Sequence, residues 1–341
     1  MSPGPRIVIA GAGAVGCFVG GLLAGGGRRV TLLARPRIQA EIRTHGLTLT
    51  DFGGMAQYLS PDDLTLAGDP ACLRHADIVL VTVKSRDTAA MAALIAQHAV
   101  PGTQVISLQN GVGNRAVLAE ALPGFDLRAG LVPFNVVPLG QGGYHRASDG
   151  DLVIENGPID LTGPLTVPGL TTASSENIEA LQWGKFLINQ FNALNALSGL
   201  PLQKQLHDRD WRRLMADQWA EAHAVLRAGK IQPKLTAPVP PRLMPALLRL
   251  PTPLFTRIAA KMLQIDPQAR TSMAQDLAAR RPTEIDALQG EVQRMGEALG
   301  RATPVTDMVI RVMGWAALAN EGLPHLPVAA LRAEIAAERK R

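Results

Sequence analysis

The chain has 341 residues, 47% of them hydrophobic and 18% charged, a composition typical of a globular protein with room for two domain cores. The net charge of +5 comes from dispersed basic residues, with one dense run at 339–341, and aromatic residues are few. This pattern argues against nucleic-acid binding and favours anionic small molecules as partners. Cys17 and Cys72 match no metal-site spacing, so we expect no metal, a reducing compartment and, without a targeting segment, a cytoplasmic location.

The first predicted elements are a strand at residues 6–10, a glycine turn and a helix that ends near Ala24. The turn reads Gly11-Ala12-Gly13-Ala14-Val15-Gly16. In such a motif the first glycine permits a tight turn, the second lets the backbone approach a pyrophosphate, and the third allows close packing of helix on strand. Together with the positive end of the helix dipole, these six residues predict a dinucleotide-binding site.

A membrane helix or signal peptide is the alternative for this region, because residues 7–27 carry no charge. Eight of those 21 residues are glycine, and glycine is unfavourable in a helix interior. We therefore expect neither a membrane-spanning segment nor a membrane partner.

The residue that follows the second predicted strand, at residues 29–34, indicates which nicotinamide cofactor binds. NAD sites usually place Asp or Glu there to accept a hydrogen bond from the ribose 2′-hydroxyl. This chain has Arg35, then Arg37, and no carboxylate before Glu41. Guanidinium groups suit a 2′-phosphate, so the sequence favours NADP(H). The alternative is that Arg35 lies in a solvated loop.

Strands and helices alternate through the first half of the chain and predict a doubly wound parallel sheet of the Rossmann type over residues 1–175. Residues 46–66 contain short segments with alternating side-chain character, which suggests a small β insertion there. Further strands are expected at residues 78–83, 104–108 and 131–137, and helices at residues 88–98 and 114–122.

Helical periodicity replaces the strand signals in the second half, which predicts an all-α domain over residues 176–341. In residues 283–299, for example, apolar side chains recur at spacings of three and four. Residues 233–253 contain seven prolines and are expected to form a long connection with at most short helices.

Polar residues follow two of the predicted strands at their carboxyl ends, where ligands of open α/β sheets bind. Lys84 follows one strand and is a candidate for the 2′-phosphate side of a cofactor. Asn110 follows the next strand and is a candidate for the ribose or nicotinamide edge. Ordinary turn chemistry accounts equally well for the pair Asn110-Gly111.

Three polar residues interrupt an otherwise apolar helix in the second half. On one continuous helix, Asn189 lies about 40° and Asn192 about 20° from Lys185, so the three form a single polar stripe. A lysine on a buried helix needs partners or a cleft, which makes Lys185 a candidate catalytic residue. The alternative is a lysine whose stem passes the core and whose ammonium reaches water.

A second polar group lies at residues 270–286. Thr283 is the expected N-cap of a helix, which places Glu284 in the first turn, where the helix dipole stabilises a carboxylate. Ser272 begins another helix-like stretch. A purely structural role is the alternative for both residues: stabilisation by the helix dipole for Glu284 and a helix cap for Ser272.

The ordered set of these motifs resembles the ketopantoate reductase family over nearly the whole chain. The motifs are GAGAVG, the Arg35 position, VKS, QNGVGN, WGKFLIN and TSMAQDLAARRPTEID. The resemblance implies a Rossmann domain followed by a helical domain, and an NADPH-dependent oxidoreductase that reduces 2-dehydropantoate to pantoate.

The resemblance also implies roles for single residues. Lys185 would be the general acid that donates a proton to the oxygen of the reacting keto group. Glu284 would orient Lys185 and hold a substrate hydroxyl. Ser272 would contact the substrate carboxylate, Asn189 the substrate, and Asn110 both the nicotinamide side and the hydroxyl.

Two departures from the family leave alternatives open. Many relatives have an asparagine eight residues after the lysine, where this chain has Ala193 and offers Asn192 as a substitute substrate contact. The segment at residues 161–176 is also shorter than in relatives, which often have an additional helix there. The alternatives are a reductase of another 2-oxo acid on the same architecture and a non-enzymatic NADP(H)-binding sensor. The sequence does not fix the oligomeric state, and a homodimer is one possibility.

Overall fold

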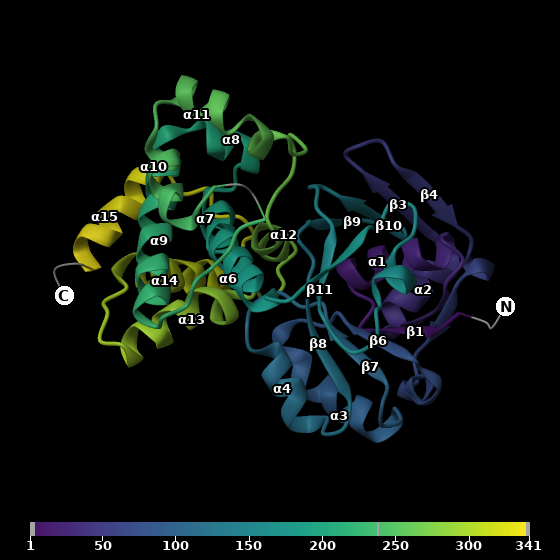
Figure 1. Ribbon diagram of the computed structural model, residues 1–341. Helices are drawn as coiled ribbons and strands as arrows, with labels where there is room; N and C mark the ends of the chain where they lie inside the picture. Colours follow the sequence, from purple (N-terminus) through teal and green to yellow (C-terminus); the bar gives the residue numbers. More distant parts are fainter. Residues whose placement is uncertain (1–3, 237–238, 339–341) are drawn as a thin grey trace. The chain divides into compact units, whose positions relative to one another are not determined.

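The computed structural model describes residues 4–236 and 239–338, so the basic run at residues 339–341 lies outside the described part. The chain divides into two compact units, Met1–Ile178 and Glu179–Arg341. The first unit contains β-sheets with helices packed on them, and the second consists of helices (Figure 1).

The main sheet of the first unit has the strand order β12-β11-β8-β7-β6-β1-β2-β5. The strands from β5 to β8 in this order are mutually parallel, β11 is antiparallel to β8, and β12 is parallel to β11. The six parallel strands follow the strand order of a dinucleotide-binding sheet, which confirms the predicted fold class. The bounds are β1 (Arg6–Ala10), β2 (Arg29–Leu33), β5 (Thr65–Ala67), β6 (Ile78–Val81), β7 (Gln104–Ser107), β8 (Asp126–Leu131), β11 (Leu152–Glu155) and β12 (Thr172–Ser175).

Helices cover both faces of this sheet because its strands are apolar on both sides. In β1, Ile7 and Ile9 belong to the core that includes α1, whereas Val8 and Ala10 belong to the core that includes α3 and α4. This alternation is the expected period of two for a strand that is buried on both faces. The helices are α1 (Ala14–Gly25), α2 (Pro36–His45), α3 (Thr88–His98), α4 (Asn114–Ala121) and α5 (Thr162–Leu165), with the 3₁₀ helices η1 (Pro61–Asp63), η2 (Pro70–His75) and η3 (Ser85–Asp87).

The predicted β insertion is present as part of a second sheet, with the order β4-β3-β10-β9, that lies beside α1 (Figure 1). The hairpin of β3 and β4 turns where the Asp51 carboxylate accepts hydrogen bonds from the backbone N–H groups of Gly53 and Met55 at 2.8 and 2.9 Å. The bounds are β3 (Leu47–Asp51), β4 (Ala56–Leu59), β9 (Val136–Gly140) and β10 (Gly143–Arg146).

The strand predicted at residues 131–137 was wrong, because this stretch joins two sheets. Strand β8 of the main sheet ends at Leu131, and β9 of the second sheet begins at Val136. Pro133 lies between them and cannot donate a hydrogen bond to a strand ladder. The Asn135 N–H is satisfied outside any sheet, by the Ser148 hydroxyl oxygen at 2.9 Å.

The described residues of the second unit form helices and no strand, as the sequence predicts. The long helix α9 packs against α10, α13, α14 and α15. No helix in the described part of the chain combines the length and hydropathy that a membrane span requires. The bounds are α6 (Ile178–Asn189), α7 (Phe191–Ser198), α8 (Leu202–His207), α9 (Arg209–Ala228), α10 (Met244–Arg249), α11 (Thr252–Ile258), α12 (Ser272–Ala278), α13 (Ile285–Ala298), α14 (Pro304–Ala319) and α15 (Val328–Glu338), with the 3₁₀ helices η4 (Pro241–Leu243) and η5 (Ala260–Leu263).

The proline-rich stretch contains only short helices in its described residues, as predicted, and a buried arginine attaches it to α9. The Arg212 guanidinium donates hydrogen bonds to the carbonyl oxygens of Leu248 at 3.1 Å and Leu250 at 2.8 Å. Its Cζ atom also lies 4.3 Å from the centroid of the Phe255 ring. These contacts satisfy backbone groups where α10 ends.

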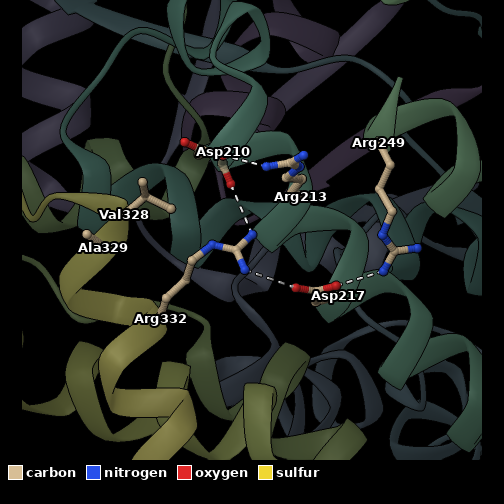
Figure 2. Close-up of a pocket in the computed structure, with 7 residues that line it drawn as sticks. All are labelled: Asp210, Arg213, Asp217, Arg249, Val328, Ala329 and Arg332. Atoms are coloured by element: carbon tan, nitrogen blue, oxygen red, sulfur yellow. Dashed lines mark hydrogen bonds and ion pairs between the residues drawn. The ribbon is translucent and has the colours of Figure 1, made fainter. Parts of the chain in front are cut away.

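A surface pocket of about 500 Å³ lies where α9, α15 and the end of α10 meet (Figure 2). Asp217 of α9 pairs with Arg249 at 2.7 Å and with Arg332 of α15 at 3.7 Å. Arg213 pairs with Asp210 at 3.1 Å along α9. The arginines around the pocket are therefore paired with carboxylates of α9, and these pairs connect three helices.

Candidate functional site

The glycine turn after β1 is held by hydrogen bonds to residues at the ends of two neighbouring strands. Gly11 has φ = 101°, and a Cβ atom there would collide with Val83. Its carbonyl oxygen accepts from the Thr82 hydroxyl at 2.8 Å, and the Ala12 N–H donates to the carbonyl oxygen of Leu33 at 3.0 Å. The turn therefore lies against the ends of β2 and β6 and requires glycine at its first position.

The other two glycines of the motif differ in what surrounds them. A Cβ atom on Gly16 would lie 2.6 Å from Thr82 Oγ1 and 2.9 Å from Ile9 Cγ2, so close packing of α1 on the sheet requires this glycine. A Cβ atom on Gly13 would meet nothing nearer than the Gly11 oxygen at 4.0 Å. The space over Gly13 is thus open, as the approach of a pyrophosphate needs.

The N-terminus of α1 also fits an anionic group. Gly13 is the N-cap and offers no capping side chain, and the first turn contains no acidic residue. The first backbone bond of the helix runs from the Cys17 N–H to the carbonyl oxygen of Gly13 at 2.8 Å. The N–H groups of Ala14, Val15 and Gly16 precede that bond and have no acceptor within the helix.

Arg35 has an ion-pair partner that the sequence analysis missed. It is the N-cap residue of α2, its side chain is 77% exposed, and its guanidinium lies 3.1 Å from the carboxylate of Asp87 in η3. Arg37 pairs instead with Glu41 at 3.7 Å. Lys84 is the N-cap residue of η3, so the Arg35–Asp87 pair connects the end of β2 with the segment after β6.

Asn110 is anchored by a network of polar side chains between the ends of β6 and β7. Its carbonyl oxygen accepts from the Ser85 hydroxyl at 3.0 Å and from Asn114 Nδ2 at 2.8 Å. Thr88 Oγ1 donates to Asn114 Oδ1 at 3.0 Å and accepts from Gln109 Nε2 at 2.7 Å. The contributions of Thr88 and Asn114 were not predicted, because buried polar residues at helix starts give no distinctive sequence signal.

The continuous helix expected through residues 185–199 was wrong, because the helix is interrupted at Gln190. The Gln190 side chain donates to the Phe186 carbonyl oxygen at 3.3 Å, the acceptor that its own N–H would use in a regular helix. That N–H instead donates to Leu187 at 3.2 Å, and the Gln190 carbonyl oxygen accepts from Gln289 Nε2 at 2.9 Å. Lys185 and Asn192 therefore lie on two helices, α6 and α7.

Lys185 is partly buried on α6 and interacts electrostatically with Glu284. Burial lowers the pKa of Lys185 from 10.5 to about 8, and the negative charge of Glu284 acts in the opposite direction. Glu284 itself is the N-cap residue of α13, so the prediction of Thr283 as N-cap was wrong by one position. The Glu284 side chain makes no capping hydrogen bond to the helix. Its position at the N-terminus of α13 agrees with the structural alternative, in which the helix dipole stabilises the carboxylate.

Asn192 and Ser272 meet where α7 packs on the start of α12. Asn192 Nδ2 donates to Ser272 Oγ at 3.3 Å. Thr271 is the N-cap residue of α12, with Ser272 the first helical residue. Thr271 donates from its hydroxyl to the Asn192 carbonyl oxygen and from its N–H to Asn195 Oδ1, both at 3.0 Å. Two residues predicted as substrate contacts are thus brought together on a well-anchored junction.

The remaining predicted positions behave differently. Asn189 is the last residue of α6, is partly exposed, and has no hydrogen-bonding partner for its side chain among the described residues. Ala193, at the position where relatives have asparagine, is fully buried. Within the helical unit, four of the five predicted site residues thus form two pairs, Lys185 with Glu284 and Asn192 with Ser272.

Comparisons with known proteins match both halves of the chain. The family model "Ketopantoate reductase PanE/ApbA" matches residues 7–158, and its C-terminal counterpart matches residues 177–315. A 2-dehydropantoate 2-reductase of Halobacterium salinarum is 28% identical over 309 residues, which cover 88% of this chain and 95% of the relative. A 2-dehydropantoate 2-reductase of Mycobacterium tuberculosis is 26% identical over 320 residues, which cover 93% and 98%.

Solved structures share the fold over nearly the full chain. A PanE/ApbA family ketopantoate reductase from Ralstonia eutropha JMP134 superposes with a TM-score of 0.77 at 30% identity, covering 93% of this chain and 99% of that one. A D-mandelate dehydrogenase in complex with NADH and anilino(oxo)acetate has the same TM-score at 22% identity, covering 92% and 99%. The matches to both family models, taken with the glycine turn and the order of the strands, show that the chain belongs to the ketopantoate reductase family of oxidoreductases.

Proposed function

We propose that this protein uses NADPH to reduce 2-dehydropantoate to pantoate, with Lys185 as the general acid. The observation that carries the proposal is the electrostatic pairing of Glu284 with Lys185, a lysine whose pKa is lowered by burial to about 8. An amine with this pKa is largely protonated near neutral pH and still gives up its proton readily.

The cofactor part of the proposal rests on the first unit. The open space over Gly13 and the uncapped N-terminus of α1 fit a pyrophosphate, and Arg35 at the end of β2 fits a 2′-phosphate. Lys84 would support the phosphate side, and Asn110 would contact the ribose or the nicotinamide. The bound nicotinamide would supply the hydride for the keto carbon.

The chemistry assigned to the chain is proton donation and charge stabilisation. As the keto carbon gains a hydride, its oxygen develops negative charge, and the Lys185 ammonium would stabilise that charge and donate the proton. Lys185 then becomes a neutral amine and regains a proton from water. Glu284 would keep the ammonium favoured before the reaction and orient it.

The substrate contacts follow from the two pairs in the helical unit. The Ser272 oxygen accepts from Asn192, so its hydroxyl hydrogen is available for a substrate carboxylate oxygen. Asn189 has a partly exposed amide with no described partner and would bind a second polar group of the substrate. Glu284 and Asn110 would hold the hydroxyl group of the substrate.

A reductase of another 2-oxo acid is the second candidate, favoured by one observation. Ala193 is buried and apolar, and the polar contact is made one residue earlier by Asn192, which lies against Ser272. A shifted amide favours a differently shaped acid. A non-enzymatic NADP(H) sensor has no use for a paired lysine and carboxylate. Substitution of Lys185 distinguishes the two functions, because it should reduce turnover of an enzyme and leave dinucleotide binding nearly intact.

The test is oxidation of NADPH by the purified protein, followed by absorbance, with 2-dehydropantoate as substrate and NADH as the cofactor control. A panel of other 2-oxo acids runs in parallel. Turnover of 2-dehydropantoate with NADPH well above all other combinations supports the proposal. Equal or better turnover of another 2-oxo acid would replace the substrate, and dinucleotide binding without any turnover would favour the sensor.

A further inference from the structure

Asp87 occupies a helix N-cap position and does not cap the helix. It precedes α3, where an aspartate ordinarily accepts hydrogen bonds from the backbone N–H groups of the first turn. Its carboxylate instead lies between two guanidinium groups, with Oδ2 at 3.1 Å from Arg35 and Oδ1 at 3.8 Å from Arg86. The side chain is 33% exposed. The negative charge of Asp87 therefore lies next to Arg35, the residue that stands where NAD sites have an Asp or Glu.

This placement affects the two nicotinamide cofactors in opposite directions. A 2′-phosphate carries up to two negative charges near neutral pH and would share the Arg35 guanidinium with the Asp87 carboxylate. Like charges around one guanidinium repel each other and weaken the binding of the phosphate. A ribose 2′-hydroxyl has no charge and can donate a hydrogen bond to a carboxylate, as it does to the acid at the end of the second strand in NAD sites.

We propose that Asp87 is a specificity-determining residue that weakens the preference of this protein for NADP(H) over NAD(H). It does so by competing with the 2′-phosphate for Arg35 and by offering the 2′-hydroxyl of NAD(H) an acceptor. The inference rests on the proposed function to the extent that a dinucleotide binds with its adenosine ribose at the end of β2.

The experiment compares dissociation constants of NADP⁺ and NAD⁺ for the wild type and Asp87→Asn by titration calorimetry. Asparagine keeps the size of the side chain and its ability to cap α3 but removes the charge. We expect the NADP⁺ preference, the ratio of the two constants, to rise about 3- to 10-fold, the scale of a solvent-screened charge interaction. An unchanged or smaller ratio overturns the proposal.

Two further variants separate the local effect from a general one. Asp62→Asn removes a charge from η1, which precedes β5 and so lies toward the opposite strand ends, and should leave the ratio unchanged. In an Arg35→Ala background, Asp87→Asn should change the ratio less than it does in the wild type, because the guanidinium for which the two anions compete is absent and only the acceptor for the 2′-hydroxyl is altered. A full gain in that background overturns the competition with the phosphate for Arg35.

Binding also separates this inference from the proposed reaction. If the wild type binds a dinucleotide but reduces no 2-oxo acid, the proposed function fails and the ratio still decides the role of Asp87. If the wild type binds neither dinucleotide, both fail. If it reduces 2-dehydropantoate and the Asp87→Asn ratio is unchanged, only the role of Asp87 fails.

Discussion

The negative charge of Glu284, at the N-cap of α13, favours the protonated form of Lys185 on α6. Burial of the lysine acts against it and is the larger effect, so the pKa of Lys185 falls to about 8. A lysine whose pKa is lowered by burial, beside a carboxylate that favours its protonated form, suits the role of proton donor near neutral pH. Substitution of either residue should therefore change the turnover or its pH dependence.

Replacing Lys185 with alanine should reduce turnover by about 100-fold or more, the scale of a lost general acid, and leave dinucleotide affinity nearly intact. Steady-state rates and titration of NADP⁺ measure the two quantities. Lys204→Ala is the matched control, since Lys204 is an exposed lysine on α8. Unchanged turnover in Lys185→Ala would remove this residue from the mechanism.

The rate of the reduction should depend on pH through Lys185. The ammonium is the donor, so kcat/KM should be level below about pH 8 and fall as the pH rises through the pKa. In Glu284→Gln the charge that raises this pKa is gone, so the alkaline limb should move to lower pH. Asp286→Asn, which removes a neighbouring exposed carboxylate, should not move it. A limb at the same pH in Glu284→Gln would contradict the pairing.

Ser272→Ala should raise the KM for the 2-oxo acid about 10-fold, equivalent to roughly 1.4 kcal/mol, with a smaller change in kcat. The reason is the loss of a hydroxyl that Asn192 orients. Because the two side chains act together, Asn192→Ala should add little in the Ser272→Ala background. Fully additive effects of the two substitutions would show that each acts alone.

Gly13→Ala and Gly16→Ala should have different effects. A methyl group on Gly16 would be 2.6 Å from Thr82 Oγ1, so this variant should lose about 1 to 3 kcal/mol of unfolding free energy. A methyl group on Gly13 fits the protein, so that variant should unfold like the wild type but bind NADP⁺ at least about 10-fold more weakly. Thermal unfolding and dinucleotide titration give both quantities. Normal NADP⁺ affinity in Gly13→Ala would place the pyrophosphate elsewhere.

Arg35→Ala should raise the KM for NADPH at least about 10-fold and change that for NADH less than about twofold, because only NADPH carries the 2′-phosphate. Arg37→Ala is the control, since Arg37 pairs with Glu41 one helical turn further along α2. Steady-state kinetics with each cofactor make the comparison. Equal effects of Arg35→Ala on both cofactors would refute the assignment.

The elements that the sequence predicts well are those with a local signal. The first strand, glycine turn and helix are such a case, because Gly11 and Gly16 are each required by atoms of neighbouring elements. The strand β8 was misplaced because it begins with charged residues. Arg128 is 3% exposed within it and is satisfied by Asp126 at 2.8 Å and by the Ile159 carbonyl oxygen at 2.7 Å. Buried charge of this kind is satisfied only by the folded chain.

Long-range and cooperative features were also beyond the sequence. Strand β10 pairs in parallel with β3, with Tyr144 opposite Leu49, and no local pattern indicates that partner. In the candidate site, the motifs predicted which residues matter but not their contacts. At the break, Gln190 keeps helical dihedral angles, φ = −58° and ψ = −26°, and its carbonyl oxygen accepts a hydrogen bond from Gln289 of another helix. The ion pair of Arg35 with Asp87 joins residues 52 positions apart.

The break at Gln190 divides the polar residues of this region between two helices. Lys185 belongs to α6 and is adjusted by α13, whereas Asn192 belongs to α7 and is anchored to the start of α12. If Asn192 contacts the substrate as proposed, a substitution that repacks α7 on α12 would change the shape of acid that fits and leave the pairing of Lys185 with Glu284 in place. On the proposed mechanism, this separation would let the substrate contact change while the proton donor stays the same.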